Sequence, residues 1–164
     1  MILDGALQFT GTPGTVSGDS PTTGTQQSTN VIDLLNARDL GIGDDPALKI
    51  LIEILTAFAG GTSLEVQLQG APDNGSGAPG SYTTMADTGA LAEAGLVAGR
   101  YIMAIDMPRI LLPSPLAPGL QALPRFLRLQ YVSVGTHGAG AIYGGIVLDR
   151  QDQISYPPGI VIAN

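Results

Sequence analysis

The chain has 164 residues, of which 44% are apolar and only 13% charged, a composition that suits one domain with a buried core. Seven basic and fourteen acidic side chains give a net charge of −7, which argues against nucleic acid as a partner because neutralising phosphates requires clustered Lys and Arg. The sequence has no cysteine and no apolar run long enough to span a membrane. The start lacks a basic segment followed by a long apolar run, so we expect it not to be a secretion leader. We therefore expect a chain of the reducing cytoplasm that has no membrane contact.

Alternating apolar and polar residues predict short strands along most of the chain. We expect these strands near residues 2–9, 30–35, 47–58, 64–69, 82–86, 100–107, 125–134, 141–150 and 160–163. The segment 47–58 also permits a helix, but its three isoleucines and the glycine pair after it favour a strand. Gly60-Gly61 fits the turn of a hairpin between two strands.

The segments between these strands are rich in Gly, Ser, Thr and Pro, which indicates long loops. We expect flexible loops near 10–28 and 70–81, and one or two helical turns in the Ala-rich segment 89–99. The sequence therefore predicts one all-β domain over residues 1–164. Its expected fold is a jelly-roll-like antiparallel β-sandwich of about eight strands, with long loops and at most one short helix.

The segment LLPSPLAPGLQALP at 111–124 has five leucines and four prolines, within a Pro/Leu-rich excursion that we place at 108–124. Prolines disfavour both a helix and a central strand there, and leucines are costly in a solvated loop. One interpretation is a partly exposed apolar patch that binds a partner, and the other, nearly equal, is a lid over the protein's own core. The residues of the expected patch are Leu111, Leu112, Leu116, Leu120 and Leu123.

The chain ends suggest a second kind of contact. The first strand, which contains Ile2 and Leu3, and the segment 154–164 have the pattern to extend the sheet edge of a neighbouring molecule. Pairing within their own sandwich is the slightly favoured alternative. A turn-stabilising ion pair in a loop is the simplest interpretation of Asp33, Arg38 and Asp39.

No pattern of catalytic or metal-binding residues stands out. The single histidine, His137, has no evident catalytic partner nearby in the sequence, and we expect it to face solvent in a loop between two strands. Asp44-Asp45 and Asp73-Asn74 lack the ligand spacing of a calcium loop and are more simply turn residues, as is Asn74-Gly75-Ser76. We therefore expect no enzyme activity, no catalytic residue, no cofactor and no metal.

Carbohydrate binding remains an alternative, because jelly rolls often serve as lectins. The chain has no tryptophan and only 5% aromatic residues, which weakens that interpretation. Tyr82 and Tyr156 are the two aromatic residues that we expect at the surface. The alternative function is therefore a carbohydrate- or receptor-binding head module, and the resemblance given below implies that such a module belongs to a virion.

Several segments, taken in order, resemble the capsid cement (decoration) proteins of short-tailed bacteriophages. They are MILDGALQF at the start, STNVIDLLNARDLGIGDDPALKILIEI at 28–54, RFLRLQY at 125–131 and VLDRQDQISYPPGIVI at 147–162. The most specific part is Ser-Thr-Asn-Val-Ile-Asp-Leu followed by Ala-Arg-Asp-Leu-Gly-Ile-Gly. The likeness runs nearly from end to end, and the loops at 10–28 and 108–124 diverge.

The resemblance implies a jelly-roll structural protein of the virion that is made in the bacterial host cytoplasm. Such a protein binds the outer capsid surface and cements neighbouring major capsid subunits without catalytic residues. Its implied partners are the phage major capsid protein and a second copy of itself, with a homodimer favoured over a trimer.

Overall fold

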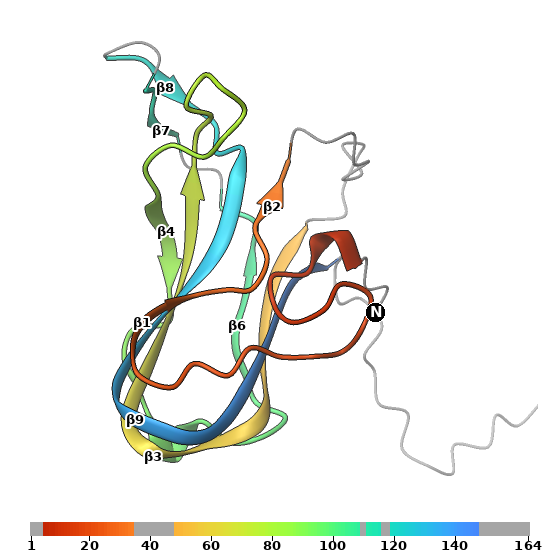
Figure 1. Ribbon diagram of the computed structural model, residues 1–164, viewed down its shortest axis with the longest axis vertical. Coiled ribbons are helices and arrows are strands. Elements are labelled where there is room, and N and C mark those ends of the chain that lie inside the picture. Colours follow the sequence, from red (N-terminus) through yellow and green to blue (C-terminus); the bar gives the residue numbers. More distant parts are fainter. Residues whose placement is uncertain (1–4, 35–47, 109–110, 116–118, 148–164) are drawn as a thin grey trace, which may run out of the picture.

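A computed structural model describes residues 5–34, 48–108, 111–115 and 119–147, which form an antiparallel all-β structure (Figure 1). Two long strands, β3 (Lys49–Ala71) and β9 (Phe126–Val147), pair with each other along their length at the centre of a seven-stranded sheet. The shorter strands of this sheet are β1 (Gly24–Gln27), β2 (Ile32–Asp33), β4 (Thr83–Asp87), β5 (Leu91–Ala92) and β6 (Tyr101–Asp106). The all-β antiparallel prediction is confirmed.

A separate two-stranded sheet consists of β7 (Leu112–Pro113) and β8 (Gln121–Ala122). The helical elements among the described residues are two 3₁₀ turns, η1 (Gly5–Leu7) and η2 (Glu93–Gly95). Of the strand expected at 2–9, the described part contains η1 and a single bridge from Gln8 to Gly145 instead. The strand expected at 160–163 lies outside the described residues.

The predicted hairpin turn at Gly60-Gly61 is wrong, because β3 continues through it without reversing direction. β9 likewise continues through Gly135 and Gly140. The strands expected at 47–58 and 64–69 are therefore one strand, β3, and those expected at 125–134 and 141–150 are parts of β9. Repeated register shifts between residues 54 and 63 of β3 let both paired strands bend together. Glycine permits this bend, since Gly60, Gly135 and Gly140 have φ of 96°, 81° and 141°. In Figure 1 the bend lies at the end opposite β7 and β8.

The bend folds the seven-stranded sheet into two layers. In one layer, the first half of β3 pairs with β6 on one side and with the last part of β9 on the other. In the other layer, the second half of β3 pairs with β4 and β5, and the first part of β9 pairs with β1 and β2. A sandwich therefore forms from one continuous sheet.

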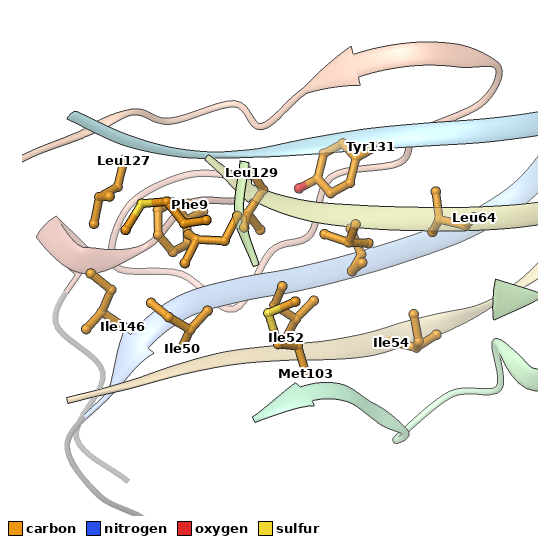
Figure 2. Packing of buried hydrophobic residues seen from close by; sticks show 14 of the residues in the cluster. Phe9, Ile50, Ile52, Ile54, Leu64, Met103, Leu127, Leu129, Tyr131 and Ile146 are labelled. Atoms are coloured by element: carbon orange, nitrogen blue, oxygen red, sulfur yellow. The ribbon is translucent and has the colours of Figure 1, made fainter. Parts of the chain in front are cut away.

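The hydrophobic core lies between the two layers (Figure 2). Alternate residues of each half of β3 and β9 face inward, because successive side chains of a strand point to opposite faces. The inward set is Ile50, Ile52, Ile54, Leu64, Val66, Leu68, Leu127, Leu129, Tyr131, Ile142 and Ile146. Phe9 from the N-terminal segment and Met103 from β6 also belong to this core.

The N-terminal loop is attached to the sandwich through the buried carboxylate of Asp19. Its oxygens accept hydrogen bonds from Thr29 N at 2.9 Å, Thr29 Oγ1 at 2.5 Å and Gly11 N at 3.0 Å. The hydroxyl of Tyr131 in the core also donates to Asp19, at 2.9 Å. The segment 10–28, expected to be only a loop, thus contains β1 and this anchor. These four hydrogen bonds replace the hydration that the Asp19 carboxylate loses when it is buried.

His137 is buried inside the bend, so the prediction of a solvent-facing loop residue is wrong. The residue is 2% exposed, and its ring packs edge-on against Phe58 with a centroid distance of 5.2 Å. Its Nε2 lies 3.3 Å from the Ser63 carbonyl oxygen, and its Nδ1 lies 3.4 Å from Glu93 Oε2. The ring occupies space that a side chain on Gly61 would fill, since a Cβ there would lie 2.2 Å from it. The bend brings these groups together.

Candidate interaction surface

The Pro/Leu-rich segment forms a small hairpin that projects from the sandwich at the end opposite the bend (Figure 1). β7 and β8 pair through Leu112 with Ala122 and Pro113 with Gln121. Ser114 N also donates to Leu120 O at 2.9 Å. The segment therefore has regular pairing of its own, which proline permits because these strands lie outside the main sheet.

The leucines of this hairpin divide into an inner and an outer set. Leu112 is 1% exposed, whereas Leu111, Leu120 and Leu123 are 53%, 64% and 68% exposed. The expectation that Leu112 is partly exposed is wrong, because it points into the protein. Leu116, Ile2 and Leu3 lie outside the described residues, and an interface role for any of these leucines stays a prediction. We refer to Leu111, Leu120 and Leu123 together as the outer leucines.

The base of the hairpin is fixed to the end of the sandwich. Arg125 N donates to Ala71 O at 2.9 Å, which joins the start of β9 to the end of β3. Pro124 packs so closely over Gly70 that a Cβ there would lie 2.9 Å from its side chain. Together, these contacts attach the base of the hairpin, which carries the outer leucines, to the sandwich.

Arg125 also makes the principal charged cluster at this end. Its guanidinium pairs with Asp33 through Nε and NH2, both at 2.9 Å, and its NH1 pairs with Asp73. The guanidinium also lies 4.8 Å from the centre of the Phe126 ring. Asp33 lies in β2, where it pairs with Arg125, and the ion pair expected from the local sequence stays a prediction. Arg38 and Asp39 lie outside the described residues.

The cluster changes the acidity of its members. The hydrogen bond from Gly75 N–H lowers the pKa of Asp73 most, desolvation opposes it, and Gly77 N–H and Arg125 lower it further. The hydrogen bond to Asp33 raises the pKa of Arg125. Asp73 is thus a stable anion at neutral pH. Sequence reasoning missed Arg125, because its two acidic partners are distant in the chain and only the fold brings them together.

The loop after β3 lies beside the hairpin. Gly80 N donates to Pro72 O at 2.8 Å, and a Cβ on Gly80 would lie 3.7 Å from Pro115. Asp73 Oδ1 accepts from Gly75 N at 2.6 Å, and Asn74 Oδ1 accepts from Ser76 N at 2.9 Å. These side chains stabilise the turn, as the sequence predicted.

The outer face of the layer with β4 is polar. Gln67 Oε1 accepts from Gln69 at 3.1 Å, Thr84 at 3.1 Å and Gln130 at 3.3 Å. The guanidinium of Arg128 lies 3.7 Å from the centre of the Tyr82 ring. One face of Tyr82 is thus already covered, and burial raises the pKa of its hydroxyl. Tyr156 lies outside the described residues.

Neither a metal centre nor a membrane-spanning helix emerges from the residues described above. Within them, no three His, Cys, Asp or Glu side chains are grouped so that they could hold a metal ion. None of the helices found there is long and apolar enough to cross a membrane.

A comparison with protein-family models matches most of the chain. No curated protein matches the chain. The family model Bbp16 matches residues 16–146, which include β1 to β8 and almost all of β9. The chain therefore belongs to the Bbp16 family, a family of phage proteins.

Proposed function

We propose that this protein is a non-enzymatic structural component of the virion that binds the outer surface of the phage capsid. In this role it cements neighbouring major capsid subunits, and it acts together with a second copy of itself. The observation that carries the proposal is that the hairpin is attached to the sandwich at its base and exposes the outer leucines. Membership of a phage protein family and the sequence resemblance to cement proteins support it.

The hairpin has the physical properties of a docking element. Leu111, Leu120 and Leu123 expose apolar surface whose removal from water contributes roughly 1–2 kcal/mol for each leucine at about 25 cal/mol per Å². Pro113, Pro115 and Pro124 restrict the backbone, so that less conformational entropy is lost when the hairpin binds. Stable interfaces have an apolar centre, and the outer leucines are suited to form it.

A capsid offers many identical binding sites, so each contact need not be strong. Two linked copies that engage neighbouring subunits gain from a high effective concentration, and their combined affinity exceeds that of either copy alone. This reasoning favours a dimer that bridges subunits over a monomer that coats them. The leucines that remain exposed on one chain then have a use in the assembled particle.

The interpretation of the segment as a lid over the protein's own core explains the burial of one leucine only. Leu112 is buried and belongs to the protein's own packing, whereas a lid would not leave three neighbouring leucines exposed. The carbohydrate-binding alternative has weaker support, because Arg128 covers one face of Tyr82. A sugar platform needs an open aromatic face.

The test uses purified capsids that lack the protein. We expect the wild-type chain to bind their outer surface, seen by cryo-EM, and to raise their resistance to heat. The double variant Leu120→Ser/Leu123→Ser is expected to melt like the wild type and to bind far less. Val16→Ser is the matched control, because Val16 is as exposed as Leu123 and lies in the N-terminal loop. Undiminished binding by the double variant, or a location away from the capsid surface, contradicts the proposal.

A further inference from the structure

The tip of the loop after β3 contains an Asn-Gly pair in an unusual setting. Asn74 and Gly75 are exposed, and Gly75 has a φ of 93°. The backbone nitrogen after an asparagine is placed to attack the carbon of the side-chain amide, and a glycine there leaves that nitrogen uncrowded. The neighbouring side chains determine whether such an attack is helped or hindered.

The amide of Asn74 is polarised by its neighbours. Asn74 Oδ1 accepts hydrogen bonds from Ser76 N at 2.9 Å, from Ser76 Oγ at 2.7 Å and from Ala78 N at 3.4 Å. Three donors that converge on one carbonyl oxygen stabilise the negative charge that develops when a nucleophile adds to the carbon. Asn74 Cγ is therefore an activated electrophile.

The nitrogen that would attack has a base beside it. Gly75 N donates to Asp73 Oδ1 at 2.6 Å, within the distance at which a carboxylate can accept the proton. Gly77 N at 3.2 Å and the guanidinium of Arg125 hold the same carboxylate in place. Hydrogen bonds from Gly75 and Gly77 lower the pKa of Asp73, which is ionised at neutral pH. The short distance from Gly75 N to Asp73 Oδ1 places this carboxylate to receive the proton.

We propose that residues 73–76 form a self-modifying site that converts Asn74 to aspartate and isoaspartate. Asp73 takes the proton from Gly75 N while this nitrogen forms a bond to Asn74 Cγ. The Cγ–Nδ2 bond then breaks, and Asp73 returns the proton to the departing nitrogen, which leaves as ammonia. The product is a five-membered cyclic imide. Water opens the imide at either carbonyl, so that one water is consumed and one ammonia is released in total.

The modification changes the end of the molecule that carries the hairpin. Each product places a new carboxylate next to Asp73, where Arg125 is already shared between two acids. The isoaspartate product also lengthens the backbone inside the loop closed by Asn74 N and Ala78 O at 2.9 Å. Gly80 of this loop lies against Pro115. A chain in which Asn74 has been converted therefore presents a different surface beside the outer leucines.

The decisive experiment compares the folded chain with the same chain unfolded in urea. Both are incubated at neutral pH, and peptide mapping by mass spectrometry follows the loss of the amide at Asn74. We expect faster conversion in the folded chain. Asn30, whose amide donates to Gly11 O at 2.9 Å, serves as the internal reference and is expected to stay intact. Faster conversion in the unfolded chain would show that the loop protects Asn74 and would overturn the proposal.

Variants then separate the proposed role of Asp73 as the base from that of Ser76 as a hydrogen-bond donor to the Asn74 amide. We expect Asp73→Asn and Ser76→Ala each to slow the conversion of the folded chain by about tenfold, and Ser76→Thr to restore the rate. Asp87→Asn is the matched control, because Asp87 Oδ1 accepts from Gly89 N in the same kind of turn without a following Asn-Gly pair. A thermal melt checks that each variant is folded. An unchanged rate in folded Asp73→Asn would rule out Asp73 as the base.

Discussion

The two ends of the sandwich use their unusual residues in opposite ways. At the bend, an aromatic ring and an imidazole are packed against glycines, and His137 is buried although its sequence context is that of a loop. At the hairpin, leucines that would normally be buried face solvent. The difference shows that the polarity of a side chain does not by itself predict whether the side chain is buried. The bend is closely packed, whereas the hairpin leaves the apolar surface of the outer leucines in contact with solvent.

The largest effect is expected at the bend, from Gly140→Ala. Gly140 has a φ of 141°, and a Cβ there would lie 2.3 Å from the Phe58 ring. Backbone strain and overpacking together should lower the free energy of unfolding by roughly 3–5 kcal/mol. Urea denaturation measures the change.

Gly138→Ala is the control for this prediction. A Cβ on Gly138 would meet nothing closer than the Ala59 carbonyl oxygen at 4.0 Å. Its effect should stay within about 0.5 kcal/mol. Equal losses in both variants would mean that the bend is not closely packed.

The next test contrasts the two sets of leucines within the hairpin. Leu112→Ala should lower the free energy of unfolding by about 2–3 kcal/mol, because it removes a buried side chain and leaves a cavity. Leu120→Ala should change it by less than about 0.5 kcal/mol, since Leu120 is exposed. The same denaturation measurement reports both values. A large loss in Leu120→Ala would favour the lid interpretation over an interface.

A smaller effect is expected from Tyr131→Phe, which tests the anchor between the sandwich and its N-terminal loop. Loss of the 2.9 Å hydrogen bond to Asp19 should lower stability by about 1–2 kcal/mol. Burial, and then the charge and hydrogen bond of Asp19, raise the pKa of Tyr131 well above its ordinary value. The folded state therefore favours the protonated hydroxyl.

This preference makes stability depend on pH in the alkaline range. The contribution is fully present below the unfolded pKa of about 10 and is lost as the pH rises above it. Denaturation of the wild type between about pH 9 and 11 should show this loss. Tyr131→Phe should lack that part of the decline. Identical alkaline profiles would contradict the assignment.

The smallest effect is expected at the half-buried Asp73 of the hairpin end. The pKa of Asp73 is lowered from 3.8, so that its stabilising contribution is present above this value and is lost as the pH falls below it. Asp73→Asn should therefore be slightly less stable than the wild type at neutral pH and should approach it on acidification. Acid titration followed by circular dichroism checks the convergence. A gap that widens at low pH would contradict the sign.

Much of the local structure could be predicted from the sequence. Alternation at residues 49–54, 64–68 and 126–131 identified strands, because a half-buried strand repeats every two residues. The prolines at 113, 115 and 124 indicated that the leucine-rich segment leaves the main sheet. Turn residues at Asp73 and Asn74 also lay where their side chains favour a turn.

The sequence by itself determined an antiparallel all-β chain and the segment that projects from it, since both follow from local periodicity and from proline. Only the tertiary structure decided whether Gly60-Gly61 reverses or bends the chain, because β9 supplies a partner strand on both sides of it. The same long-range pairing buried His137 and brought Arg125 between Asp33 and Asp73. These contacts join residues far apart in sequence, and no local pattern encodes them.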